Sequence, residues 1–366
     1  MEDELRIKRI VFWQNILSHL LFPLIKEITK VNKFEICIVV PRLLTKEREK
    51  IGWEKQNTEL VKIVVNPNEN EVKKEIQRMP DKTLHVFSGI SSYKFIGKAF
   101  KASLRINTKR AIISETYRFQ GLMGYIRLLK GRFEAIRFGN EISIIYAIGE
   151  NGCKWYRMCG YPDSKINKIK YYTEEKKKYH KVNERDCFVL TYIGQLIRRK
   201  GLDLLIKALK EIEIKNWELD IVGNGKEQKK IKEFVEEFGL GNKVNFKGSV
   251  KNSEINSYLN ESDLLVLPSR WDGWGAVVNE ALMAGVPVVC SSNCGAAELV
   301  YESGYGEVFK SSCWRMLKET IERQINKGKV DNKKRREIKE WSKKIVPAIG
   351  ALEFVQTVKR IEKVVK

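Results

Sequence analysis

The sequence contains little histidine and shows no ordered cysteine pattern. Three histidines occur in 366 residues, and the seven cysteines are scattered and odd in number. A disulfide framework normally uses an even set of cysteines at regular spacings, so we expect free thiols in a reducing compartment. Cys290 and Cys294 lie close enough to suggest a metal site, but no second pair accompanies them and few histidines could complete it. We therefore predict no metal.

Long hydrophobic runs are also absent. No window of about 18 consecutive apolar residues occurs, and Glu2, Asp3 and Glu4 stand where a signal peptide would be basic. Hydrophobic residues make up 43% and charged residues 31% of the chain, which is typical of globular proteins. We expect a cytoplasmic protein whose length suits two domains better than one.

Acidic residues are too few to balance the basic ones. The chain has 68 Lys and Arg against 46 Asp and Glu, which gives a net charge of +22. Residues 91–140 alone hold eleven basic and two acidic residues. Such an excess indicates either a lysine-rich background composition or an anionic partner. Nucleic acid is not expected as that partner, because no nucleic-acid-binding motif accompanies the charge.

Short apolar runs alternate with amphipathic stretches, which predicts an α/β fold of parallel strands joined by crossover helices. In the first half we expect strands at Ile7–Trp13, Phe34–Val40, Leu60–Val65, Thr83–Phe87, Lys109–Ser114 and Ile142–Ile148. In the second half we expect strands at Cys187–Gly194, Trp217–Val222, Lys243–Lys247, Asp263–Leu267 and Pro287–Cys290.

A charged segment, Thr173–Asp186, interrupts this alternation and predicts a domain boundary. We expect an N-terminal domain over residues 1–180, a C-terminal domain over 181–340, and a last helix over 341–366 that crosses back to the first domain. Both domains should be doubly wound and Rossmann-like. Ligands of such sheets bind beyond the carboxyl ends of the strands, so we expect a central cleft between the domains.

The stretch PSRWDGWGAVVNEALMAGVPVV (Pro268–Val289) places two carboxylates around a glycine-rich helix start. Asp272 lies in the loop after a strand, Gly275 opens the helix, and Glu280 lies more than a turn inside it. Free amides at a helix start bind anions, and a carboxylate can accept hydrogen bonds from two sugar hydroxyls. The simpler interpretation is an acidic residue that favours the helix dipole and a solvated glutamate.

The second half resembles the GT4 family of retaining glycosyltransferases, which have the two-domain GT-B fold. The family's E-x7-E region, usually PS-x-x-E-G-F-G-x-x-x-x-E-A-x-A-x-G-x-P-V, is similar to Pro268–Val289. Further blocks resemble the family in the expected order at Tyr192–Leu209, Leu219–Gly225 and Val244–Arg270. The first half resembles it in layout, with a weaker similarity at Ala147–Ile166. The resemblance implies a nucleotide-diphosphate sugar as co-substrate, with no cofactor and no metal.

The resemblance also implies roles for individual residues. Glu280 stands where the family binds the nucleotide ribose, and Asp272 stands where it contacts the transferred sugar. Lys200 matches the lysine that neutralises the diphosphate, so Asp272 and Lys200 are catalytic candidates. The remaining donor-binding candidates are Gly194, Gln195, Arg199, Gly223, Val250, Gly273, Trp274, Gly275, Ala276 and Val277.

Two of these residues depart from the family pattern. Gln195 replaces the arginine that usually follows the first glycine of the loop, and Asp272 is one methylene shorter than the usual glutamate. Arg198 and Arg199 are the candidates to supply the missing positive charge from the other end of the loop.

Three strand ends in the first half carry polar residues and are expected to line the same cleft. His19, Ser88 and Glu115 are therefore acceptor or cleft candidates. Glu115 is also a catalytic candidate, because relatives place a histidine near the reacting sugar at about this position. Glu115 could instead balance nearby arginines, and His19 could be a structural histidine.

Basic and aromatic residues are mixed at helical spacing over residues 94–133. Basic amphipathic helices bind anionic membranes, so we expect contact with the inner face of the plasma membrane. A solvated helix packed on its sheet is the alternative. The resemblance implies transfer of a sugar to a polyprenyl-diphosphate-linked glycan in bacterial O-antigen or capsule synthesis. Two alternatives stay open: another GT-B enzyme such as a nucleotide-sugar epimerase, and a non-catalytic basic protein that binds membrane or nucleic acid.

Overall fold

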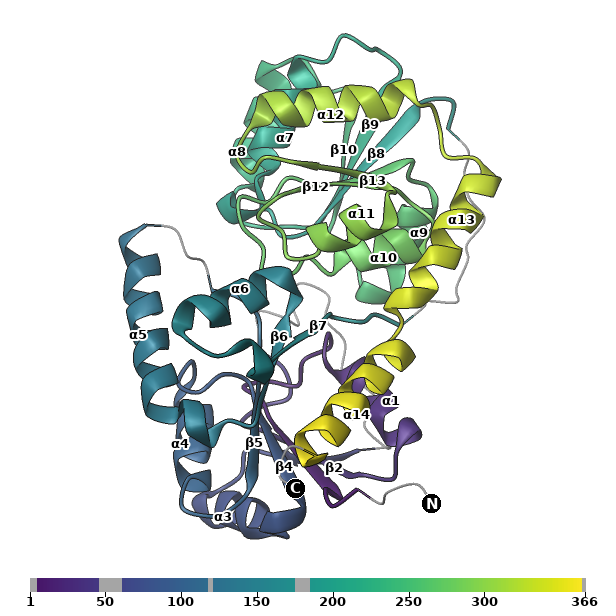
Figure 1. Cartoon of the computed structure of the whole chain (residues 1–366). Helices are drawn as coiled ribbons and strands as arrows, with labels where there is room; N and C mark the ends of the chain where they lie inside the picture. Colours follow the sequence, from purple (N-terminus) through teal and green to yellow (C-terminus); the bar gives the residue numbers. More distant parts are fainter. Residues whose placement is uncertain (1–4, 46–60, 118–120, 175–184, 364–366) are drawn as a thin grey trace. The chain divides into compact units, whose positions relative to one another are not determined.

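The computed structural model describes residues 5–45, 61–117, 121–174 and 185–363 (Figure 1). These residues divide into two compact units. The first unit contains residues 5–45, 61–172 and 347–363, and the second contains residues 173–174 and 185–346. The boundary expected at residue 180 lies outside the described residues. The chain returns to the first unit at Pro347, and the sequence expectation was residue 341.

The first unit is built on a parallel sheet with the strand order β3-β2-β1-β4-β5-β6-β7. In chain order the strands are β1 (Arg9–Trp13), β2 (Glu35–Val40), β3 (Lys62–Val65), β4 (Thr83–Phe87), β5 (Lys109–Ser114), β6 (Ile144–Ile148) and β7 (Ile166–Ile169). In β1, Ile10 pairs with Ile36 of β2 and with Leu84 of β4. The strands β1, β4 and β6 are buried throughout, which explains why they read as nearly continuous apolar runs.

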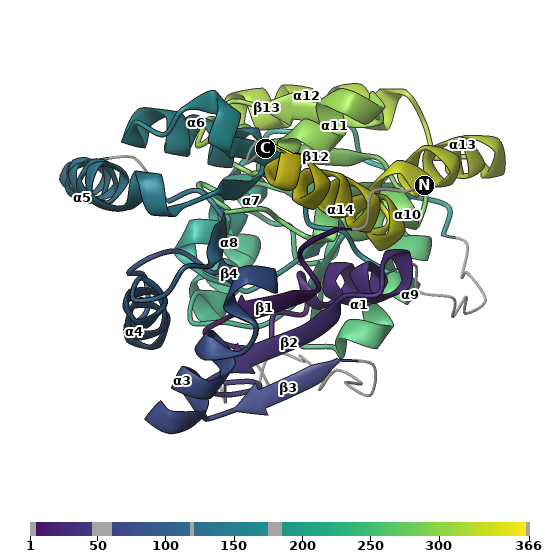
Figure 2. The same ribbon diagram turned by 60° about the horizontal axis from the view of Figure 1, so that its bottom comes forward.

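Helices cover both faces of the first sheet. The face that carries Val11 and Trp13 packs against α3 (Glu69–Gln77), α4 (Lys94–Ser103), α5 (Leu122–Phe138) and α6 (Gly149–Cys159). Phe12 alternates with these residues and points to the other face. There α1 (Phe22–Val31) and α14 (Pro347–Lys363) lie side by side, as Figures 1 and 2 show. The ring of Phe354 in α14 stacks on Tyr146 with centroids 4.4 Å apart.

The second unit is a parallel sheet with the order β10-β9-β8-β11-β12-β13. Its strands are β8 (Phe188–Ile193), β9 (Trp217–Val222), β10 (Val244–Gly248), β11 (Leu264–Leu267), β12 (Val288–Ser291) and β13 (Gly306–Phe309). One face forms a core with α7 (Leu202–Lys210), α8 (Gln228–Glu237) and α12 (Trp314–Asn326). On the other side of the sheet lie α9 (Ile255–Asn260), α10 (Val277–Met283), α11 (Ala297–Ser303) and α13 (Asn332–Ser342) (Figure 1).

Both sheets reverse their strand order once. The reversal lies between β1 and β4 in the first unit and between β8 and β11 in the second. This is the doubly wound arrangement, whose ligands bind beyond the carboxyl ends of the strands at the reversal. The prediction of two doubly wound α/β domains is confirmed.

Two features differ from the sequence expectation. The edge strands β7 and β13 were not predicted, because they are short and mostly half-buried and so lack a clear apolar run. The last helix is interrupted: α13 ends at Ser342, and α14 begins at Pro347. Proline forces the preceding Val346 into an extended conformation, with ψ of 155°. Among the described residues, no helix is both long and apolar enough to cross a bilayer.

Candidate functional site

The loops beyond β8, β9 and β11 pack closely around the strand reversal of the second unit. A Cβ atom on Gly223 would lie 2.0 Å from the carbonyl oxygen of Gly194, and one on Gly201 would lie 2.1 Å from that of Pro268. No side chain fits at such distances, so glycine is required where these backbones meet. The predicted residues Gly194 and Gly223 therefore hold two strand-end loops against each other.

The loop after β11 is fixed to the loop after β12 by backbone hydrogen bonds. Asp272 N–H donates to the Asn293 carbonyl at 3.0 Å, and Gly295 N–H donates back to the Asp272 carbonyl at 3.1 Å. Gly275 adopts φ of +92°, and a Cβ there would lie 2.6 Å from Cys294 Sγ. The Cys294 thiol donates to the Trp274 carbonyl at 2.8 Å. This cysteine thus has a structural role beneath the loop.

Trp274 anchors the same loop from inside. Its side chain is 1% exposed, and its indole N–H donates to Asn279 Oδ1 at 2.8 Å. Only the backbone of Trp274 is therefore available to a ligand. In the structure α10 begins at Val277, so Glu280 lies in the first turn of that helix. This corrects the expectation that the helix opens at Gly275 and that Glu280 lies deeper.

Two cations gather on the Asp272 carboxylate, which is 8% exposed. Lys200 Nζ lies 2.5 Å from Oδ2, and an Arg199 guanidinium nitrogen lies 3.4 Å from Oδ1. Arg199 also donates to the Trp271 carbonyl at 3.0 Å. Both basic residues belong to a short 3-10 turn, Arg198–Lys200, between β8 and α7. The structure thus brings together three of the predicted residues from segments about 70 residues apart.

A buried tyrosine at the end of β8 stabilises the loop that follows this strand. Burial raises the pKa of Tyr192, and the nearby Asp272 carboxylate raises it further, so the phenol stays protonated. Its hydroxyl donates to the Gln195 carbonyl at 2.8 Å. Gln195, Gly273 and Ala276 lie in the same two loops, whereas Val250 follows β10, two strands away from β8.

An ion pair not predicted from the sequence joins the two main loops. Arg270 binds both oxygens of Asp203, at 2.7 and 2.6 Å, and also donates to the Arg198 carbonyl at 2.8 Å. A bidentate pair of this kind adds geometric precision. The only sequence signal was a basic residue directly after the strand-ending Pro268–Ser269.

The acceptor candidates all lie beyond strand ends of the first sheet. His19 follows β1, Ser88 follows β4, and Glu115 follows β5. The Ser88 amide donates to the Trp13 carbonyl at 3.0 Å, which joins two of these strand ends. Close by, the hydroxyls of Ser92 and Tyr117 are hydrogen-bonded to each other. The first unit therefore carries hydroxyl groups at its own strand reversal.

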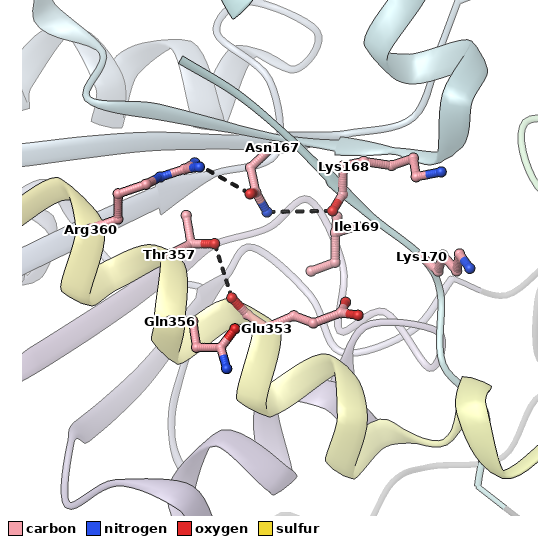
Figure 3. Close-up of a pocket in the computed structure, with 8 residues that line it drawn as sticks. All are labelled: Asn167, Lys168, Ile169, Lys170, Glu353, Gln356, Thr357 and Arg360. Atoms are coloured by element: carbon pink, nitrogen blue, oxygen red, sulfur yellow. Dashed lines mark hydrogen bonds between the residues drawn. The ribbon is translucent and has the colours of Figure 1, made fainter. Parts of the chain in front are cut away.

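A hollow of about 450 Å³ opens elsewhere in the first unit, between β7 and α14 (Figure 3). Polar groups on its walls bind one another: Arg360 donates to Asn167 Oδ1 at 3.3 Å, and Thr357 donates to the Glu353 carbonyl at 2.9 Å. Tyr172 donates to the Glu353 carboxylate at 2.5 Å. We attribute this hollow to the packing of α14 on the sheet, and it contains none of the sequence candidates. Within the described ranges, no three His, Cys, Asp or Glu side chains cluster as metal ligands.

The second unit is similar to a known protein family. Residues 173–345 match the family model described as glycosyl transferases group 1. We call the second unit the group 1 domain, after the family that it matches. The matched residues include the Asp272 loop, Lys200 and Glu280, and they end just before the chain returns to the first unit.

Curated relatives of the group 1 domain match over part of their length. An uncharacterized glycosyltransferase of Methanocaldococcus jannaschii is 31% identical over 162 residues, which cover 44% of this chain and 45% of the relative. The lipopolysaccharide core biosynthesis glycosyltransferase LpsD of Rhizobium meliloti is 35% identical over 106 residues, 29% of this chain and 30% of LpsD. The chain therefore spans less than half the length of these relatives.

Solved structures are similar over nearly the whole chain. Anabaena HepE in complex with UDP has a TM-score of 0.73 at 16% identity, and the match covers 97% of this chain and 100% of HepE. The apo form of the lipopolysaccharide outer core galactosyltransferase WaaB also has a TM-score of 0.73, at 15% identity, with 96% and 99% covered. At these identities the likeness concerns the fold, which is GT-B with one Rossmann-like domain in each unit.

Proposed function

We propose that the protein is a retaining glycosyltransferase of the GT4 type that uses a nucleotide-diphosphate sugar. The sugar passes to a glycan acceptor on a polyprenyl-diphosphate carrier, in the synthesis of a bacterial surface polysaccharide such as O-antigen or capsule. The acceptor is bound at the cytoplasmic face of the inner membrane, whose anionic surface is a further partner. The nucleotide sugar is a co-substrate, and the reaction needs neither a cofactor nor a metal.

One observation carries the donor-site proposal: Lys200 and Arg199 meet on Asp272 at the strand reversal of the group 1 domain. Two cations beside a glycine-lined backbone suit a diphosphate, which would replace the carboxylate as their partner. Asp272, released from Lys200, would then accept hydrogen bonds from the transferred sugar. Glu280, in the first turn of α10, is proposed to bind the ribose.

The charges at this site suit the chemistry of transfer. Breaking the bond between the sugar C1 and the phosphate oxygen leaves an oxocarbenium-like sugar and a diphosphate anion. Lys200, Arg199 and backbone amides would stabilise that anion in the transition state. The acceptor hydroxyl attacks C1 on the face that the phosphate leaves, and its proton passes to a phosphate oxygen. The configuration at C1 is retained, and no protein nucleophile is needed.

The names of similar proteins support the substrate class. HepE was solved with UDP and also with UDP-glucose. LpsD is named for lipopolysaccharide core biosynthesis, and a Mycobacterium tuberculosis relative is named as a GDP-mannose-dependent mannosyltransferase acting on a phosphatidylinositol monomannoside. These names favour a nucleotide-sugar donor and a glycan or glycolipid acceptor. The nucleotides that they mention differ in the base, which is uracil for HepE and guanine for the mannosyltransferase.

Thermal unfolding against UDP, GDP, ADP, CMP and their sugar conjugates tests the proposal. A ligand at a hundred times its dissociation constant adds about 2.7 kcal/mol to stability. We expect a shift with one nucleoside diphosphate and a larger one with its sugar conjugate. Glu280→Ala should weaken this binding at least tenfold, whereas Glu237→Ala, an exposed residue of α8, should not. No shift with any nucleotide would favour a non-catalytic protein on the same fold.

A further inference from the structure

Helix α5 carries an exposed apolar stripe. Large side chains recur along it at positions i, i+4, i+7, i+11 and i+14, the spacing of one helix face. They are 48% to 86% exposed, and they are Leu122, Ile126, Leu129, Phe133 and Ile136. Single exposed apolar residues are ordinary, but a contiguous stripe over four turns marks an interaction surface.

This stripe lies opposite the face by which α5 packs on its own unit. The packing face repeats the same spacing two residues later, through Gly124, Leu128, Gly131, Ala135 and Phe138, all buried or half-buried. Two positions along a helix correspond to about 200° of rotation. On the packing side a Cβ on Gly131 would lie 2.5 Å from Cys159 Sγ of α6, so the two helices already touch. The outer stripe therefore cannot be buried by the contacts that hold α5.

Positive charge borders the stripe. The helix contains Arg127, Lys130, Arg132 and Arg137, all exposed, against the single acidic residue Glu134. Glu134 faces inward and accepts a hydrogen bond from Ser91. By helical geometry Lys130 and Arg137 lie within about 80° of the centre of the stripe on one side, and Arg132 lies at a similar angle on the other. An apolar stripe between cations matches the acyl boundary and headgroups of an anionic bilayer.

We propose that α5 is a membrane-docking helix whose outer stripe inserts into the interface of an anionic lipid surface. Figures 1 and 2 show α5 at the outer margin of the first unit. The neighbouring α4 does not take part, because its apolar residues Ile96, Ala99 and Phe100 are fully buried. The docking surface thus lies on α5, which begins inside the basic region 94–133 and extends beyond it to Phe138. This inference deepens the proposed function, since it names the element that meets the membrane.

Sedimentation of the full chain with lipid vesicles tests this proposal. Vesicles of phosphatidylglycerol and phosphatidylcholine in equal parts serve as the anionic surface, and phosphatidylcholine alone is the neutral one. The double variant Leu129→Ser, Ile136→Ser should lower the partition coefficient on anionic vesicles by at least about tenfold. Lys130→Gln should lower it about fivefold, and less as salt rises. Tyr301→Ser, which removes a 70% exposed aromatic ring from α11 in the second unit, is the matched control and should change nothing.

Three results would overturn the docking proposal. It fails if the unaltered chain does not sediment with anionic vesicles, or if the double variant binds as well as the parent. It also fails if light scattering shows a dimer that the double variant separates, because a second copy would then cover the stripe. Vesicle binding is measured without nucleotide, and the nucleotide shift is measured without vesicles. The double variant should keep that shift unchanged, so the docking proposal and the donor-site proposal can fail separately.

Discussion

Replacing Asp272 by asparagine should destabilise the ligand-free protein. The substitution leaves Lys200, whose side chain is only 14% exposed, without a counter-charge beside Arg199. Breaking a buried ion pair costs about 3–5 kcal/mol. Arg199 is 36% exposed and remains partly solvated, so we expect about 2–3 kcal/mol here. For a unit of this size that loss lowers Tm by about 4–12 °C.

The same substitution should strengthen the binding of a nucleoside diphosphate. In the unliganded protein Asp272 competes with the diphosphate for Lys200, and Asp272→Asn removes the competitor. A hydrogen bond to a charged group contributes about 1.5–3 kcal/mol, so the Kd of the diphosphate should fall at least about tenfold. The added affinity for the sugar conjugate should disappear, because the carboxylate that would bind the sugar is gone. Calorimetric titration of UDP and of UDP-sugar, or of whichever base the unfolding screen selects, measures both effects.

Glu307→Gln is the matched control for Asp272→Asn. Glu307 in β13 binds Arg323 and Lys327 of the same unit, and none of these three residues lies in the loops after β8, β9 or β11. Burial alone would raise the pKa of Glu307, but the hydrogen bonds from these cations lower it, so the ionised form is stabilised. Its loss should lower Tm without changing any nucleotide affinity. Unchanged or weaker diphosphate binding by Asp272→Asn would refute the competition between carboxylate and diphosphate.

Three further predictions concern the fold. Gly223→Ala places a Cβ 2.0 Å from the Gly194 carbonyl oxygen, so it should lower the unfolding free energy by about 3 kcal/mol and abolish the nucleotide shift. The control Gly239→Ala has no atom within 4 Å of the new Cβ and should lower the unfolding free energy by about 1 kcal/mol. Burial, then nearby guanidinium charges, lower the pKa of His85 from 6.5 to about 3. The unfolded chain therefore binds the proton first, so His85 should lower the unfolding free energy by about 1.4 kcal/mol per pH unit as pH drops from about 6.5 towards 3. Urea titrations of His85→Gln should give a slope that is smaller by this amount. Phe354→Ala empties a fully buried position and should cost about 3–5 kcal/mol in the same assay; a loss under about 1 kcal/mol would contradict the docking of α14 in the first unit.

The sequence predicts the central strands because burial on both faces leaves a simple signal. Thr83–Phe87 and Trp217–Val222 begin and end in the structure where the apolar runs begin and end. The edge strands β7 and β13 do not follow the same rule, since most of their residues are only half-buried and polar residues are tolerated there. Helix ends fail where glycine conformation intervenes: Gly275 is held in the left-handed region by the loop, and α10 starts only at Val277.

For the site, the sequence supplies the residues but not their partners. Lys200 and Asp272 are 72 residues apart, and no local pattern reveals that they pair before a ligand binds. The sequence also cannot choose between Arg198 and Arg199 as the replacement for the arginine missing at Gln195. Neighbouring side chains in a turn point in different directions, so only the folded loop decides. The Arg199 guanidinium donates to Asp272, whereas the backbone carbonyl of Arg198 accepts a hydrogen bond from Arg270.

Helix α5 shows how size, rather than hydrophobicity, decides which side of a helix is buried. Both of its stripes are apolar, so the pattern alone predicts a helix without an obvious inner face. The inner stripe contains the small residues Gly124, Gly131 and Ala135, which let α5 approach α6 until Gly131 meets Cys159. A phenylalanine or isoleucine would not fit in that gap without separating the helices. The outer stripe of large apolar side chains therefore stays exposed, and only a partner can remove it from water.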